Sequence, residues 1–223
     1  MSAQQDDNRI ARKYLASFID GSYKESIYLE YRHAINGGFT LYTRIRGYDY
    51  HVTDIKFFYV LAKLLDQLPL TSAIVIPHQI GILHNNSEEA VTLEEWLFPF
   101  GERDTNTVVY QLKFMTGSRH IETARYEGDF GAVSEDLRKR INGEFQLKVC
   151  YFCKYLVEYS DFGGTDYRHD QLYCFRDAPQ VLDKLMQLYP VLRNHESLLK
   201  EGTPDMDAIH SCAAFTYREQ PRP

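Results

Sequence analysis

The feature that most constrains the fold is a pair of segments in which apolar and polar residues alternate, joined by Asn36-Gly37-Gly38. In residues 25–35, apolar residues such as Ile27 and Leu29 occupy every second position, which is the side-chain period of a half-buried β-strand. The same alternation resumes in residues 39–46. Asparagine and glycine readily adopt the positive φ angles of a tight turn, so this region predicts a β-hairpin.

The rest of the chain mixes strand and helix signals, with no internal repeat and no long linker. Residues 53–68 show the three-and-four spacing of an amphipathic helix that ends before Pro69. Hairpins with interspersed helices predict an α+β fold on a mainly antiparallel sheet. The further helices expected are residues 92–97, 135–141 and 179–189, and the further strands are residues 74–76, 80–83, 107–115, 119–126, 145–149, 171–175 and 209–217.

The cysteines divide the chain, because all four lie between residues 150 and 212. We therefore expect an α+β N-terminal part over residues 1–143 and a zinc-stabilised C-terminal part over residues 144–223. We expect the two parts to pack as one globular unit, because a chain of this length can bury a sizeable core.

The cysteine spacing points to a metal site. Cys150 and Cys153 form a C-x2-C pair, and Cys174 and Cys212 follow at longer intervals. A C-x2-C turn brings two thiolates to the same side of the chain, and two more soft ligands complete the tetrahedral shell of zinc. A shell of four cysteines leaves no open coordination position, so the sequence predicts a structural Zn²⁺ site at these four residues.

Other interpretations of the cysteines stay open. Two disulfides would use the same residues, although the chain shows no recognisable secretory signal and cytosolic thiols stay reduced. A thioredoxin-like redox pair normally starts a helix, whereas residues 148–159 have an extended pattern. A third interpretation is that the four cysteines are unconnected residues of the hydrophobic core. His169 and His210 are the fallback ligands if one cysteine does not bind the metal.

Three cysteine-containing segments together resemble the C-terminal motif of a group of uncharacterised bacterial proteins. That motif has a C-x2-C pair followed by a tyrosine, a loop with glycine, a C-F-R segment and a late C-x-x-F. The resemblance covers roughly the last seventy residues and implies a small cysteine-ligated module, without implying an activity. The matching segments here are residues 150–153, Leu172-Tyr173-Cys174-Phe175-Arg176 and Cys212-Ala213-Ala214-Phe215.

The composition narrows the environment and the partners. The 223 residues carry a formal net charge of −6, which argues against a protein dedicated to binding phosphate backbones. No apolar run approaches the roughly 18 residues of a membrane span, so we expect a cytoplasmic protein without membrane contact. The 17 tyrosines suit half-buried strands, with an aromatic binding surface as the alternative.

No catalytic template occurs in the sequence. It contains no Walker A loop, no G-x-S-x-G elbow, no H-E-x-x-H helix and no Rossmann fingerprint. The alternative is an enzyme whose residues meet only in the folded protein. His78 and His84 flank a predicted turn, and with Glu94 or Glu95 they would form a metal or acid–base site there.

The sequence therefore favours a cytoplasmic, non-enzymatic binding or adaptor protein whose C-terminal part is held by zinc. Its acidic and aromatic character suits a protein partner, and the narrowest hypothesis is a bacterial immunity-type protein that binds a basic toxin. A third hypothesis is a zinc-knuckle nucleic-acid binder that uses Lys154, Arg168 and Arg176. The basic residues 138–140 are instead expected to complement the dipole at a helix end.

Overall fold

Two compact units make up the chain. The computed structural model describes residues 10–34, 38–54, 57–85, 87–102, 107–117, 119–128, 130–141, 143–149, 152–153, 156–159 and 171–188. The first unit combines Met1–His78 with Thr92–Asn142, and the second combines Gln79–Val91 with Gly143–Pro223. The division at residues 143 and 144, and the packing of both parts as one globular unit, stay predictions.

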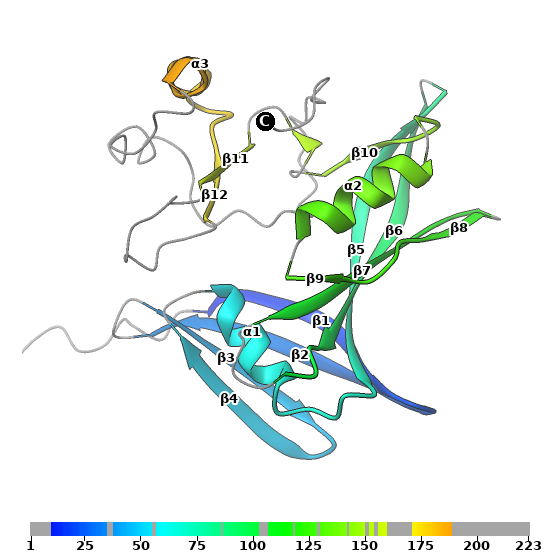
Figure 1. The fold of residues 1–223 in the computed structure, drawn as a ribbon, viewed down its shortest axis with the longest axis vertical. Coiled ribbons are helices and arrows are strands. Elements are labelled where there is room, and N and C mark those ends of the chain that lie inside the picture. Colours follow the sequence, from blue (N-terminus) through cyan, green and yellow to red (C-terminus); the bar gives the residue numbers. More distant parts are fainter. Residues whose placement is uncertain are drawn as a thin grey trace, which may run out of the picture. The chain divides into compact units, whose positions relative to one another are not determined.

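The first unit is built from antiparallel hairpins (Figure 1). Strands β1 to β4 follow one another in the chain and pair with their neighbours, and the order across the sheet is β4-β3-β2-β1-β5-β6-β7-β8. This confirms the predicted α+β fold with a mainly antiparallel sheet. The strands that lie wholly or partly in this unit are β1 (Ile10–Asp20), β2 (Tyr23–His33), β3 (Phe39–Ile45), β4 (Tyr48–Asp54), β5 (Ser72–His84), β6 (Ser87–Pro99), β7 (Val108–Thr116), β8 (Arg119–Glu122) and β9 (Tyr126–Glu127), the last of which pairs with β7.

The predicted hairpin is present as β2 and β3, which pair from Glu30 opposite Tyr42 to His33 opposite Phe39. Alternate residues of β2 are buried, because one face of the strand packs on the core while the other faces solvent. The buried residues of this face include Ile27, Leu29 and Tyr31. The predicted turn residues 36 and 37 lie outside the described part of the chain.

Two helices cover parts of this unit. Helix α1 (Phe57–Leu65) contacts β3 and β4 and buries Val60, Leu64 and Leu65, which confirms an amphipathic helix within residues 53–68. Its expected start is wrong, because residues 53 and 54 belong to β4. Helix α2 (Phe130–Ile141) contacts β7, and it begins before the residue 135 expected from the sequence. Ser134 lies within the helix and is buried.

Two local predictions are wrong. Residues 92–97 are not a helix but the middle of β6, which pairs without interruption with β7 from Thr92 to Pro99. Thr92 and Glu95 have the spacing of a helix capping box, but this local signal is overridden by strand pairing. Residues 74–76 and 80–83 are not two strands joined by a turn, since both belong to β5. Pro77 fits there because the pairing with β1 ends at Val75, so its missing N–H costs no hydrogen bond to β1.

The basic residues 138–140 lie in the last turn of α2, at the helix end where the sequence predicts them. Arg138 pairs with Glu135 at 2.7 Å, and Arg140 pairs with Asp136 at 2.8 Å. Burial acts to raise the pKa of Asp136, but hydrogen bonds from Arg140 and from the Ala124 N–H hold that pKa below its ordinary value. These contacts support a structural role for this basic run.

The second unit has a small core around part of β5. Strand β10 (Gln146–Lys148) pairs with Gly81–Leu83 of β5, and Ile82 and Leu147 are buried. Strands β11 (Leu156–Tyr159) and β12 (Gln171–Cys174) form a separate antiparallel pair. Helix α3 (Pro179–Leu188) matches the helix expected at residues 179–189, and the strand expected at residues 209–217 lies outside the described residues.

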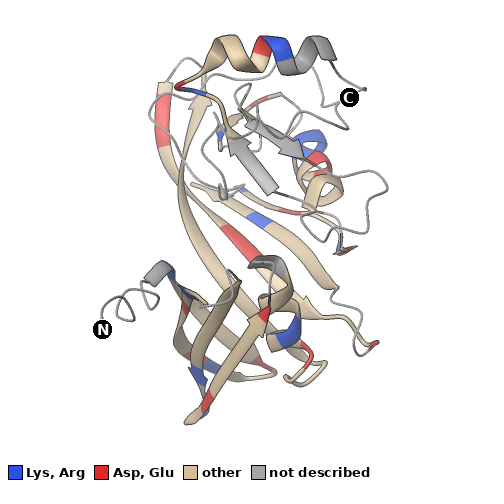
Figure 2. Ribbon diagram, turned by 90° about the vertical axis from the view of Figure 1, so that its left-hand side faces the viewer, with Lys and Arg blue, Asp and Glu red and all other residues tan. Residues whose placement is uncertain are grey.

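Charged residues of both signs are interspersed along the described ribbon (Figure 2). Among the described residues, no helix combines the length and the apolar character needed to cross a membrane.

Candidate functional site

The exposed face of β1 to β4 carries a group of aromatic and basic side chains that we name the outer tyrosine cluster. The strand register builds it: Glu30 lies opposite Lys13 on one side and Tyr42 on the other, and Tyr42 lies opposite His51. The neighbouring row pairs Leu15 with Tyr28. The cluster consists of Lys13, Leu15, Tyr28, Glu30, Arg32, Tyr42 and His51.

Three large side chains of this cluster remain exposed. Leu15 is 55% exposed, Tyr28 is 56% exposed and Tyr42 is 38% exposed. They lie on one face of three neighbouring strands, with Leu15 directly opposite Tyr28. Large apolar side chains that gather exposed on one face of a globular domain often mark an interaction surface.

Cations hold the two tyrosine rings in place. The Lys13 Nζ lies 4.5 Å from the ring centroid of Tyr28, and the Arg32 guanidinium carbon lies 4.7 Å from that of Tyr42. The ring of His51 stacks on Tyr42 with centroids 6.5 Å apart and planes 24° apart. These contacts restrict the rotamers of side chains that are otherwise open to solvent.

Glu30 fixes both cations at the centre of the cluster. It accepts a hydrogen bond of 2.7 Å from Arg32 Nε and lies 3.6 Å from Lys13 Nζ. The hydrogen bond from Arg32 is the main reason that the pKa of Glu30 lies below its ordinary value. Two cations and one carboxylate give these three side chains a net charge of +1, so the cluster presents rings rather than a strong field.

A second group of aromatic and basic residues, the tryptophan cluster, lies on β6, β7 and the segment after β8. Here Lys113 Nζ lies 3.9 Å from the ring centroid of Trp96, and Arg125 lies 3.8 Å from that of Phe98. The two rings stack at 6.1 Å, and Trp96 donates a hydrogen bond of 2.8 Å to Glu94. Phe98 is buried and Trp96 is half-buried, so this cluster mainly stabilises the fold. The cluster consists of Glu94, Trp96, Phe98, Lys113 and Arg125.

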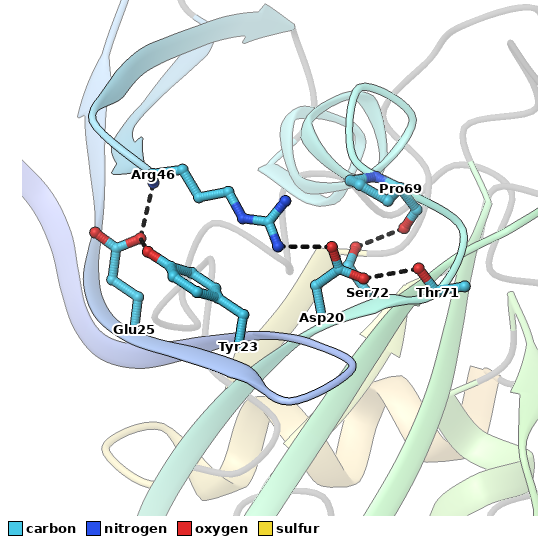
Figure 3. A network of polar contacts seen from close by, with 7 residues as sticks. All are labelled: Asp20, Tyr23, Glu25, Arg46, Pro69, Thr71 and Ser72. Carbon is cyan, nitrogen blue, oxygen red and sulfur yellow. Dashed lines mark hydrogen bonds and ion pairs between the residues drawn. The ribbon is translucent and has the colours of Figure 1, made fainter.

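A polar network joins three turns at one end of the sheet (Figure 3). Arg46, at the β3–β4 turn, pairs with Asp20 at 2.7 Å, and its backbone N–H donates to Glu25 at 2.7 Å. Thr71, before β5, donates to Asp20 at 2.7 Å, and Tyr23 donates to Glu25 at 3.0 Å. The network therefore fixes the ends of the strands that carry the outer tyrosine cluster.

This network shifts the pKa of Asp20 and that of Tyr23. The hydrogen bond from Thr71 is the main reason that the pKa of Asp20 is lowered, and Arg46 lowers it further. The hydrogen bond to Glu25 raises the pKa of Tyr23. Both shifts follow from stabilising the form that each contact requires, the carboxylate of Asp20 and the protonated phenol of Tyr23.

Two of the residues considered for an enzyme site meet. His78 Nε2 lies 3.2 Å from a carboxylate oxygen of Glu95, and both side chains are largely buried. His84 does not join them, because its ring packs at 4.7 Å against Phe145 and lies 3.2 Å from Asn85. Glu94 instead accepts the hydrogen bond of Trp96.

Two of the four predicted zinc ligands, Cys153 and Cys174, lie among the described residues. Cys153 is buried, Cys174 is half-buried at the end of β12, and no disulfide joins the two. Among the described residues, no group of three or more histidine, cysteine, aspartate or glutamate side chains is placed to hold a metal ion. Arg176, considered for nucleic-acid binding, pairs with Asp177 at 3.1 Å. Cys150, Cys212, Lys154, Arg168, His169 and His210 lie outside the described residues.

Sequence reasoning missed β1 and β4, and with them three of the seven residues of the outer tyrosine cluster. Alternation was present as a signal in β1, where Ala16 and Phe18 are buried and Leu15 is exposed. In β4 the alternation is short and runs directly into residues that resemble a helix start.

No family model, no curated protein and no solved structure matches this chain.

Proposed function

We propose that this protein is a non-enzymatic binding protein that contacts a partner protein through the outer tyrosine cluster. The observation that carries this proposal is the exposure of Leu15, Tyr28 and Tyr42 on one face of three neighbouring strands. Tyrosine and arginine are enriched in protein interfaces, because they offer large contact areas with few rotatable bonds to immobilise.

The charges of the cluster favour a protein partner over a nucleic acid. Lys13 and Arg32 both contact Glu30, so its carboxylate offsets one of the two positive charges that would attract a phosphate. The chain as a whole carries a net charge of −6. A single-stranded oligonucleotide that binds tightly at low salt, and is released as salt rises, would support the nucleic-acid hypothesis instead.

The narrower hypothesis of an immunity-type protein against a basic toxin rests on the acidic balance of the whole chain. The outer tyrosine cluster does not favour a basic partner, because its three ionised groups sum to +1. An enzyme at His78, His84 and Glu95 is less well supported, since His84 contacts Phe145 and Asn85.

A paired substitution tests the binding proposal. Tyr28→Thr with Tyr42→Thr removes both rings and keeps residues that favour strands. The partner is first identified by co-purification from the host. Its affinity is then measured by titration for the wild type and for the double variant. We expect at least about a tenfold loss of affinity, because interface tyrosines commonly act as hot spots.

Leu70→Ser is the matched control for that experiment. Leu70 is 67% exposed in the turn before β5 and does not belong to the cluster. The control should bind as the wild type does. Equal affinity of the tyrosine variant and the wild type would remove the proposal.

We further propose that Cys150, Cys153, Cys174 and Cys212 bind a structural Zn²⁺ that stabilises the second unit. The C-x2-C spacing and the clustering of all cysteines support it. Protein purified without added zinc should contain about one equivalent of the metal, and less than about half an equivalent would contradict the site. Cys153→Ser should lose the metal and lower the free energy of unfolding, because metal binding is coupled to folding.

A further inference from the structure

Strand β4 is an edge strand of the sheet. It pairs along its whole length with β3, from Ile45 opposite Tyr48 to Phe39 opposite Asp54. Among the described strands, none pairs with its other side. The backbone groups on that side therefore form an edge that can accept a further strand.

The turn geometry identifies the backbone groups at this edge. Arg46 and Gly47 have φ angles of 53° and 82°, which is the pattern of a two-residue hairpin turn. In such a hairpin the flanking pair, Ile45 and Tyr48, exchanges backbone hydrogen bonds, and every second pair after it does the same. The N–H and C=O groups of Asp49, His51 and Thr53 therefore point away from β3.

This edge lacks the features that normally block strand addition. β4 contains no proline, no lysine and no shift in its register with β3. Its two carboxylates have cations beside them, since Asp49 lies 3.7 Å from Arg44 and Asp54 pairs with Lys63. The opposite end of the sheet differs, because β8 has 4 residues and offers a much shorter edge.

We propose that β4 pairs with β4 of a second copy of this chain, antiparallel and centred on His51. This register uses the whole strand and matches the outward-facing residues with one another. Asp49 faces Thr53 of the second copy, and Tyr50 faces its Val52. No carboxylate faces a carboxylate, and aromatic residues opposite β-branched residues are favourable cross-strand pairs.

The self-complementarity of β4 is the reason to choose a second copy over an unrelated peptide. The pairing forms about six backbone hydrogen bonds between the copies. His51 and Tyr42 belong to the outer tyrosine cluster and lie on the last two strands. The dimer therefore joins the exposed faces of two clusters into one wider surface, and its formation does not depend on any partner protein.

Concentration-dependent association tests the proposal. One strand pair makes a small interface, so we expect a dissociation constant on the order of tens of micromolar. Sedimentation velocity over about a hundred-fold range around this value should show a monomer giving way to a dimer. Backbone amide exchange, followed by NMR, should slow at Asp49, His51 and Thr53 as the concentration rises, because only these amides gain partners.

Substitutions separate this edge from other modes of association. His51→Pro removes the central outward N–H without removing a bond to β3, and it should keep the protein monomeric. His51→Ala keeps that N–H and should still form the dimer. Association that is equal in His51→Pro and His51→Ala, or a wild type that is monomeric at the highest concentration, overturns the proposal.

A charge swap tests the register even if the proline variant does not fold. Thr53→Asp places a carboxylate opposite Asp49 of the second copy and should weaken the dimer about tenfold or more. Adding Asp49→Lys places a cation opposite the new carboxylate and should restore association. Failure of the second substitution to restore it contradicts the register centred on His51.

Discussion

The outer tyrosine cluster and the tryptophan cluster are built from the same kinds of contact but leave their rings in different environments. In the tryptophan cluster, Phe98 is 8% exposed and Arg125 covers its ring at 3.8 Å. In the outer tyrosine cluster, Tyr28 is 56% exposed although Lys13 lies over its ring at 4.5 Å. A cation beside an aromatic ring therefore does not by itself reveal whether the pair stabilises the fold or serves an interface.

The difference comes from what else surrounds each ring. Trp96 stacks on Phe98 and donates a hydrogen bond to Glu94, so this one side chain makes both an apolar and a polar contact within the fold. Tyr42 stacks on His51 and Arg32, which are themselves near the surface. The tryptophan cluster should therefore contribute to stability and the outer tyrosine cluster to recognition.

The largest expected effect comes from removing the tryptophan. Trp96→Thr keeps a residue that favours strands but loses the ring that stacks on Phe98 and lies under Lys113. We expect the free energy of unfolding to fall by about 2–3 kcal/mol, somewhat below the cost of truncating a fully buried tryptophan. Urea unfolding monitored by circular dichroism measures the change.

Tyr28→Thr is the matched substitution in the other cluster. Its ring is mostly exposed, so we expect the free energy of unfolding to change by no more than about 0.5–1 kcal/mol. If Tyr28→Thr destabilises the protein as much as Trp96→Thr, both clusters are parts of the core and the comparison fails.

A smaller effect concerns the turn network that holds the strands of the outer tyrosine cluster. The folded pKa of Asp20 lies below its ordinary value, mainly because of Thr71. Its contribution to stability is therefore present above the ordinary carboxyl pKa and is lost as the pH falls through the lowered value. Asp20→Asn should lower Tm at about pH 5, and the difference from the wild type should shrink as the pH falls toward about 2.

Thr71→Val separates the contribution of the Thr71–Asp20 hydrogen bond to stability from the contribution of the other contacts of Asp20. It removes the hydroxyl that donates to Asp20 and leaves Arg46 in place. We expect a smaller loss of Tm than in Asp20→Asn, with the same direction of pH dependence. A loss of Tm that is equal at both pH values would show that the ionised form of Asp20 contributes nothing.

The sequence was most informative where structure is local. The hairpin of β2 and β3 follows from alternation and turn residues, and α1 and α3 follow from their spacing. Residues 92–97 show the limit, because Thr92 and Glu95 have the spacing of a helix start while the segment pairs with β7. Pairing with a distant strand is a tertiary interaction that a local pattern does not report.

The outer tyrosine cluster was out of reach for the same reason. Alternation in β2 places Tyr28 and Glu30 on one face, but only the register with β1 brings Leu15 and Lys13 beside them. That register depends on the β1–β2 turn and on contacts between strands, and no short segment encodes it. The zinc site is the reverse case, since it was predicted from spacing and stays a prediction.

The most direct test of the central claim compares both clusters in one NMR titration. The chain contains a single tryptophan, so its indole N–H signal reports on the tryptophan cluster without ambiguity. Adding the identified partner should shift or broaden the signals of Leu15, Tyr28 and Tyr42 and leave the indole signal unchanged. Partner binding that moves the indole signal and leaves those three residues unaffected would contradict the account.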